Sequence, residues 1–177
     1  MMPVDDAFLE RWCPLYINMA PDQKKYKRIL ALAKKDYKAT GSLAFPTLLE
    51  IVRWKSPRPL RHFLKHRNGT YYFHGIRACL LEEDDRKLPA LCELDGIEAA
   101  MASAILHFVF PRRFPIIDFR TVEALHQLGY IEFSRASKTS YGEFRNAILD
   151  IRKATGGQWS LRDIDMALFA YHKQALS

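Results

Sequence analysis

Residues 88–129, LPALCELDGIEAAMASAILHFVFPRRFPIIDFRTVEALHQLG, decide the fold of this chain. Apolar residues recur at helical spacing in this stretch, and the pair Asp95-Gly96 interrupts them. Asp-Gly is a typical turn sequence. The segment after the turn is rich in alanine, so another backbone can come close to it. The sequence therefore predicts a helix that ends at Leu94, a tight turn, and a second helix that reaches about His107.

A loop with two prolines, Pro111 and Pro115, follows the second helix and leads to Asp118. The apolar periodicity resumes directly after Asp118, which predicts a third helix. Aspartate is a preferred N-cap residue because its carboxylate accepts a backbone N–H of the first turn. Capping alone explains the residue, a catalytic carboxylate is the second interpretation, and one side chain can serve both roles.

The rest of the chain has helical periodicity nearly throughout. Ser140 and Glu143 have the spacing of a capping box, and Ser160 and Asp163 approximate one with aspartate in place of glutamate. The segment 70–74, TYYFH, is a candidate for a short strand, and the alternative is a helix capped by its threonine. These patterns predict an all-α fold with about eight to ten helices.

The composition is typical of a globular protein, with 49% hydrophobic and 27% charged residues among 177. No apolar run approaches the roughly 20 residues that span a bilayer, so we expect no membrane partner. The start, MMPVDDAFLERW, lacks the apolar core of a secretion signal, so we expect a cytoplasmic protein. Cys13, Cys79 and Cys92 match no zinc spacing and cannot supply four ligands to an iron–sulfur cluster, so we expect no metal and no cofactor.

The formal net charge of +7 is unevenly placed. Residues 22–67 contain 13 lysines and arginines against three acidic residues, a local balance of +10, so the remaining chain sums to −3. A basic lobe of this kind is typical of a protein that binds a polyanion, with nucleic acid as the first candidate. The alternative is a solvated, lysine-rich helix face.

Residues 88–129 resemble the helix-hairpin-helix DNA glycosylase superfamily, the group of endonuclease III, adenine glycosylase and the 3-methyladenine glycosylases. The family pattern is a leucine, a Pro-Gly-Val-Gly hairpin, a helix of small residues, a loop, and an aspartate that opens a helix. The positions that match this pattern are Leu94, Gly96, Ile97 in place of valine, Ala102, Pro111, Ile116, Ile117, Asp118, Val122, Leu128 and Gly129.

The resemblance implies a two-lobed helical bundle with a helix-hairpin-helix motif, formed by a single domain over 1–177. It also implies a hydrolase of base excision repair that flips a damaged or modified base out of DNA and cleaves its N-glycosidic bond. Asp118 would be the catalytic carboxylate. Predicted contacts to the DNA backbone are Gly96, Ile97 and Glu98 in the hairpin, Lys55, Arg58 and Arg61 in the basic lobe, and Arg112 and Arg113 in the loop before Asp118.

The chain departs from the family pattern at several positions. Asp95 replaces the hairpin proline and Glu98 replaces its second glycine, so negative charge stands where the family presents bare backbone to phosphate. Either these side chains turn away or the hairpin binds DNA poorly. Ala100 occupies the position of the lysine that bifunctional members use to form a Schiff base, so we expect a monofunctional enzyme without lyase activity. Phe119 and Arg120 also differ from the usual residues after the aspartate.

Aromatic residues are the candidates for the wall of a base pocket. Trp54 is favoured because the basic residues Lys55, Arg58 and Arg61 follow it closely in the sequence. Tyr26 and Trp12 are further candidates. Aromatic residues at helical spacing are also ordinary core residues, which is the alternative for each of them.

Two histidines, His62 and His66, have an i,i+4 spacing that could face a metal, but no carboxylate ligand accompanies them in the sequence. A basic surface that faces DNA is the favoured interpretation. We expect a monomer whose partner is DNA, nucleoid-associated if the source is bacterial. A DNA-binding module of the same fold without catalysis, and an interaction domain that binds no DNA, are the alternatives.

Overall fold

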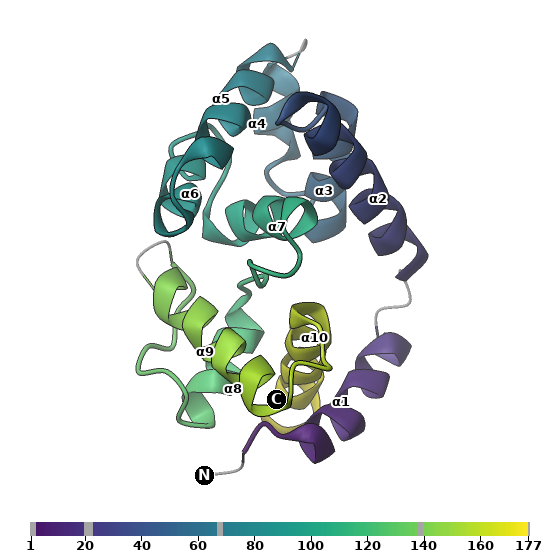
Figure 1. Ribbon diagram of the computed structural model, residues 1–177, viewed down its shortest axis with the longest axis vertical. Helices are drawn as coiled ribbons and strands as arrows, with labels where there is room; N and C mark the ends of the chain where they lie inside the picture. Colours follow the sequence, from purple (N-terminus) through teal and green to yellow (C-terminus); the bar gives the residue numbers. More distant parts are fainter. Residues whose placement is uncertain (1–2, 20–22, 67–68, 138–139, 177) are drawn as a thin grey trace. The chain divides into compact units, whose positions relative to one another are not determined.

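The computed structural model describes residues 3–19, 23–66, 69–137 and 140–176, and within them the chain forms helices and no strand (Figure 1). The predicted all-α fold is therefore confirmed, and the segment TYYFH is helical. The helices in chain order are α1 (Asp6–Met19), α2 (Gln23–Thr40), α3 (Phe45–Lys55), α4 (Leu60–Lys65), α5 (Thr70–Leu81), α6 (Asp84–Leu91), α7 (Ala99–Val109), α8 (Phe119–Gln127), α9 (Tyr141–Ala154), α10 (Leu161–Tyr171) and the short π-helix η1 (His172–Leu176).

The chain divides into two compact units. Unit 1 comprises Met1–Gln23 and Pro111–Ser177, and unit 2 comprises Lys24–Phe110. In unit 1 the first helix of the chain, α1, packs against α10 near the other end of the sequence (Figure 1). None of the helices in the described part of the chain is long and apolar enough to cross a membrane.

The central helix of unit 1 is α10, which contacts α1, α8 and α9. Eight of its eleven residues are buried, so it is covered on nearly all sides. Most of these buried residues are apolar, as expected for a core helix, but Arg162 and Asp165 are among them. Charged residues are almost never buried unless they are paired, so the burial of Arg162 and Asp165 is unusual for a core helix.

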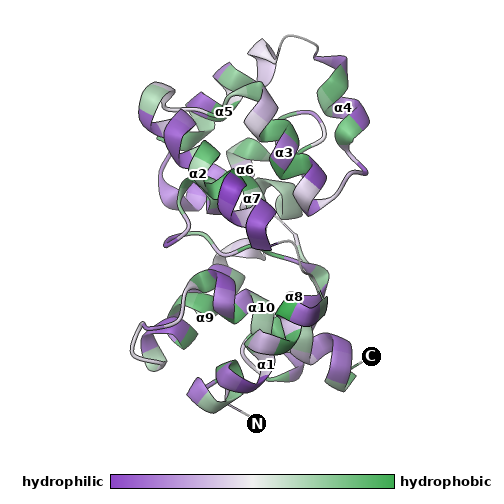
Figure 2. Ribbon diagram, turned by 90° about the vertical axis from the view of Figure 1, so that its right-hand side faces the viewer, coloured by the Kyte–Doolittle hydropathy of each residue, from purple (hydrophilic) through white to green (hydrophobic). Residues whose placement is uncertain are grey.

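The central helix of unit 2 is α7, in which residues 101–109 are all buried. It packs against α3 and α6, and its alanines Ala102 and Ala104 are fully buried. The predicted role of the small residues is consistent with these contacts. On the outer helices of both units hydrophobic and hydrophilic residues occupy different sides, so the apolar sides form the two cores (Figure 2).

The predicted helix caps have mixed outcomes. Ser160 and Asp163 form the expected capping box at the start of α10. The box predicted at Ser140 is wrong, because the Ser140 hydroxyl bonds the preceding loop and makes no side-chain cap. Glu143 instead accepts the backbone N–H of Glu132 at 3.1 Å. The third predicted cap is also wrong, since Thr70 is already the first residue of α5.

Candidate functional site

The predicted turn between the helices of residues 88–129 is present, but α6 ends three residues earlier than expected. Its last residue is Leu91 rather than Leu94, because the N–H of Leu94 bonds the carbonyl of Leu91 at 3.1 Å in a tight i→i+3 turn. The next turn follows at once, with the N–H of Ile97 bonded to the carbonyl of Leu94 at 3.1 Å. Gly96 lies inside it with a φ of 73°.

We predict that Gly96→Ala destabilises the protein. The φ of 73° is left-handed, and an added Cβ would lie 2.6 Å from the Cβ of His62, well inside van der Waals contact. We expect a loss of about 2 kcal/mol or more in the free energy of unfolding, measured in urea. Gly142→Ala is the matched control: it lies within α9, a Cβ there meets nothing within 4 Å, and alanine is the better helix former. Equal effects of the two substitutions would contradict this description of the turn.

The acidic side chain of the turn, Asp95, is bound within unit 2. Its Oδ1 lies 3.0 Å from Nδ1 of His62, and its Oδ2 lies 3.7 Å from Nε2 of His66, both on or next to α4. Its backbone N–H donates to the Tyr71 hydroxyl at 3.1 Å, and its carbonyl accepts the Tyr72 hydroxyl at 2.8 Å. The side chain of Asp95 is therefore turned toward hydrogen-bond partners within unit 2, which is one of the two alternatives stated for it.

Two opposing effects act on the pKa of Asp95. Desolvation raises it, whereas the hydrogen bond and charge of His62, with further contributions from Lys65 and His66, lower it, and the net pKa is below the ordinary value of 3.8. A lowered pKa means that the carboxylate stabilises the fold above pH 3.8, and that this contribution is lost as the pH falls through the pKa of the folded state.

We therefore predict that the difference in unfolding free energy between the wild-type protein and Asp95→Asn depends on pH. It should be largest above the ordinary pKa of 3.8, where the carboxylate is ionised, and should shrink as the pH falls through the lowered pKa of the folded state. Urea unfolding of both proteins across this range measures it. A difference that stays constant with pH would show that the charge of Asp95 plays no part.

The two histidines do not form part of a metal site with Asp95. Among the residues that the structure describes, no group of three or more histidine, cysteine, aspartate or glutamate side chains could hold a metal ion. A carboxylate does lie beside the two histidines in the folded protein. It belongs to Asp95, 33 residues along the chain from His62, and it acts as an ion-pair partner.

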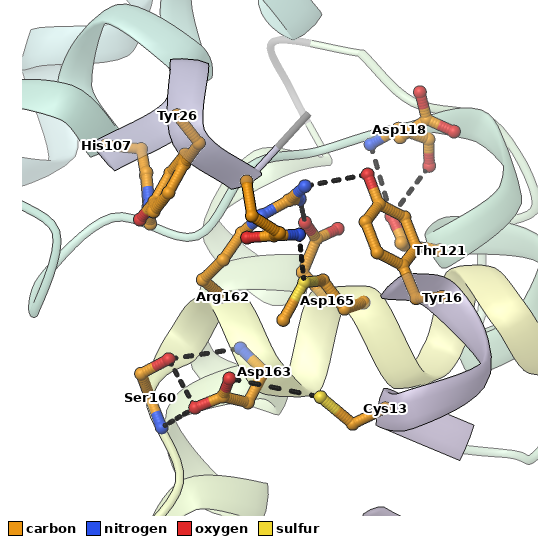
Figure 3. Close-up of polar contacts among 12 residues, drawn as sticks. Cys13, Tyr16, Tyr26, His107, Asp118, Thr121, Ser160, Arg162, Asp163 and Asp165 are labelled. Atoms are coloured by element: carbon orange, nitrogen blue, oxygen red, sulfur yellow. Dashed lines mark hydrogen bonds and ion pairs between the residues drawn. The ribbon is translucent and has the colours of Figure 1, made fainter. Parts of the chain in front are cut away.

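Asp118 is the N-cap of α8, as the sequence predicts. Its Oδ1 accepts the N–H of Arg120 at 3.1 Å, and Thr121 closes the box from the other side (Figure 3). The Thr121 hydroxyl accepts the N–H of Asp118 at 3.2 Å and donates to its carbonyl at 2.9 Å. An acidic residue at this end of a helix interacts favourably with the helix dipole. Phe119, the next residue, is 53% exposed, and the Arg120 guanidinium lies over its ring.

A buried polar network of unit 1 lies near this cap. Arg162 and Asp165 form an ion pair through Nη1 and Oδ2, and Arg162 Nη2 donates to the Tyr16 hydroxyl at 2.7 Å (Figure 3). The ion-paired side chains are only 10% and 5% exposed. Burial raises the pKa of the Tyr16 phenol, Arg162 opposes this, and the charges of Asp165 and Asp118 raise it further.

The sequence pattern alone does not predict this network. Asp165 follows the capping residue Asp163 by two positions, but its carboxylate is the buried partner of Arg162. The available indication is an arginine and an aspartate at i,i+3 in a helix whose other buried residues are all apolar. Nothing in the sequence pairs Tyr16 with Arg162, because 146 positions separate them.

Two of the three predicted pocket aromatics lie together in unit 2. Tyr26 and Trp54 have ring centroids 5.9 Å apart, and Trp54 meets Phe108 edge-on at 5.1 Å. The Tyr26 hydroxyl lies 2.8 Å from Nε2 of His107, a histidine that is only 1% exposed (Figure 3). Tyr26 and Trp54 both keep part of their surface exposed. The rings of Tyr26 and Trp54 are thus partly exposed, and the Tyr26 hydroxyl makes a polar contact with the buried His107.

Trp12, the third predicted aromatic, belongs to the core of unit 1. It is 7% exposed and packs with Phe8 and Tyr171, at centroid distances of 6.2 and 5.3 Å. A ring covered in this way offers no face to a flipped base, so Trp12 has the core role that was its alternative interpretation.

The predicted DNA contacts are distributed over both units. Unit 2 carries the turn, in which the Ile97 side chain is buried and Glu98 is the exposed N-cap residue of α7 without a side-chain cap. The basic residues Lys55, Arg58 and Arg61 also lie in unit 2, and the two arginines are exposed. Arg112 and Arg113 are exposed on unit 1, together with Asp118, which is partly exposed.

Comparison of the chain with models of known protein families, with curated proteins and with solved structures found no match in any of the three. The structure thus defines an all-α protein of two compact units. Unit 1 contains the aspartate that caps α8 and the polar network around Arg162. Unit 2 contains the tight turn at Gly96 and the exposed arginines Arg58 and Arg61.

Proposed function

We propose that the protein is a monofunctional DNA N-glycosylase that removes a damaged or modified base by hydrolysis, with Asp118 as the catalytic carboxylate. The observation that carries the proposal is the fixed carboxylate of Asp118 at the start of α8, whose charge contributes to the raised pKa of Tyr16 in the part-buried Tyr16–Arg162 contact. A buried ion pair seldom increases stability, because desolvation costs offset the attraction. Its position near Asp118 is therefore better explained by function.

The chemistry requires a fixed negative charge. When the bond between the base nitrogen and C1′ of the sugar breaks, its electron pair leaves with the base and positive charge develops on the sugar. A carboxylate held at C1′ stabilises this charge and orients the water that adds there, and a proton of that water ends on the departing base. The cap fixes the Asp118 side chain through Arg120 N–H, which limits its freedom before the substrate arrives.

The remaining parts of the proposal concern DNA binding and base recognition. The exposed Arg58 and Arg61 supply charge for the phosphate backbone, and the ion pairs of Asp95 with His62 and His66 reduce its repulsion of phosphate. In unit 2 the partly exposed Tyr26 and Trp54 offer rings on which a DNA base can stack. Because Ala100 carries no amine, no Schiff base forms at this position and the DNA strand stays intact after base release.

The test is base release from a panel of duplexes, each with one modified base, at enzyme excess over DNA. The proposal predicts an abasic site in at least one duplex and strand breakage only after alkali treatment. Release of free base detected by chromatography is the readout. No release from any member of a panel that spans alkylated, deaminated and oxidised bases would contradict the proposed activity.

A DNA-binding module without catalysis is the second candidate, and one observation favours it. Glu98, exposed at the start of α7, places negative charge at the backbone that would face phosphate. This candidate predicts salt-dependent DNA binding without base release, and a gel shift at low and moderate salt alongside the panel distinguishes the two. A protein that shifts no duplex at low salt would exclude both and leave an interaction domain.

A further inference from the structure

The outer side of α2 carries a row of lysines that the site in the previous sections does not use. The helix contains seven lysines and arginines and one acidic residue. At 100° per residue, Lys27, Lys34 and Lys38 lie within about 40° of one another, and Lys24 and Lys35 extend the row to about 100°. We call these five residues, all exposed, the α2 lysine row.

The row lies on the side of α2 opposite to the core of unit 2. Ile29 and Ala33, the two residues of this helix that are fully buried, are centred roughly 170° away from it. From Lys24 to Lys38 the row is about 21 Å long. Between the lysines it contains only the small side chain of Ala31, so an approaching surface meets charge without an apolar obstacle.

The charges of the row are not compensated within the part of the chain that the structure describes. Asp36, the acidic residue of α2, accepts the N–H of Ala44 at 3.0 Å and so is used at the start of α3. Glu50 of α3 is paired with Arg28 and Arg53. No lysine of the row makes an ion pair with a residue that the structure describes.

Most of this arrangement opposes the stability of α2, and only Lys38, in the last turn, interacts favourably with the helix dipole. Lys24 lies in the first turn, where the helix dipole disfavours positive charge and where no acidic residue is present. Lys34 and Lys38 are an i,i+4 pair of like charges, and Lys35 and Lys38 are an i,i+3 pair, so both repel. A row that costs stability and has no partner in its own fold is explained by a partner outside it.

We propose that the α2 lysine row is a second DNA surface, which binds the phosphate backbone of duplex DNA without regard to sequence or base modification. A straight row of exposed ammonium groups matches a line of phosphates, and it holds DNA through released counterions. An anionic membrane fits less well, because the apolar side of α2 is buried in unit 2 and the only apolar side chain among the lysines is the small one of Ala31. The inference rests on the proposed function only for its partner, DNA, and requires no base release.

The test measures binding of a short unmodified duplex by fluorescence anisotropy at several salt concentrations. The row variant carries Lys27→Gln, Lys34→Gln and Lys38→Gln. The control variant, Arg135→Gln, Lys153→Gln and Lys173→Gln, removes the same charge from exposed positions of unit 1. We expect the row variant to lower the slope of log affinity against log salt by about 2.7 and the affinity by about 10- to 100-fold at low salt, because each phosphate contact contributes about 0.9 to the slope.

Three further results decide the outcome. The row variant should unfold at the same or a higher temperature than the wild-type protein, because repulsion is relieved. Base release at saturating enzyme should be unchanged in it, so absence of release from the wild-type protein would overturn the proposed activity while the binding result stands. Equal losses in the row and control variants would overturn the inference, as would binding of the wild-type protein to phosphatidylserine vesicles in preference to the duplex.

Discussion

Asp118→Asn is expected to abolish base release while the protein stays folded. In the proposed mechanism the substitution removes the negative charge that would stabilise the developing positive charge on the sugar, so we expect the single-turnover rate to fall by at least about 100-fold. Asparagine is as good an N-cap as aspartate, so its amide oxygen can still accept the N–H of Arg120. The measurement is free base released per unit time, with circular dichroism as the check on folding.

Asp118→Ala is the matched comparison for this experiment. Alanine removes both the charge and the cap, and we expect an additional loss of about 1 kcal/mol in the free energy of unfolding. If Asp118 acts through its charge, the two variants lose base release equally and differ in stability. A rate that survives in Asp118→Asn and falls only in Asp118→Ala would reduce the role of the residue to capping.

Asp165→Ala is expected to have the largest effect on stability of any substitution considered. It leaves the Arg162 guanidinium in a site where the side chain is 10% exposed, without the carboxylate that neutralises it. Breaking a buried pair from one side typically costs about 3–5 kcal/mol, which corresponds to a melting temperature about 10 °C lower in a domain of this size. Thermal and urea unfolding measure the effect.

Replacement of the whole network by apolar residues is the control. A variant with Tyr16→Phe, Arg162→Met and Asp165→Leu removes all three polar groups, and we expect its stability to be close to that of the wild-type protein or above it. Base release should nevertheless fall, because the polar network near Asp118 is gone. A loss below about 1 kcal/mol in Asp165→Ala would contradict the description of the pair as buried and coupled.

The parts of the fold that the sequence predicts are those encoded by neighbours along the chain. The all-α fold follows from apolar periodicity, the cap at Asp118 from the residue and the helix after it, and the turn at Asp95-Gly96 from a dipeptide. Local hydrogen bonding also explains the errors. Ser140 has the spacing of a capping box, but its hydroxyl bonds the loop before the helix, and a spacing rule does not contain that competitor.

The parts of the site that the sequence does not predict are pairs between distant positions. Tyr16 and Arg162 meet across 146 residues, and His62 and Asp95 meet across 33. Neither pair changes the periodicity of the helices that carry it. The sequence alone likewise predicts that the charge of Asp95 disfavours contact with DNA. The two imidazoles beside it become its neighbours only in the folded protein.

Under the proposed function Asp118 carries the catalysis, and a side-by-side comparison of the wild-type protein with Asp118→Asn is the most stringent test of this role. Wild-type protein and Asp118→Asn, at equal concentration and in excess over DNA, are incubated with the panel of modified duplexes, and the released free base is quantified over time. If Asp118 is catalytic, we expect the wild-type protein to release at least one base and the variant to release it at least about 100-fold more slowly. Equal rates in the two proteins would contradict it, as would no release by the wild-type protein from any duplex.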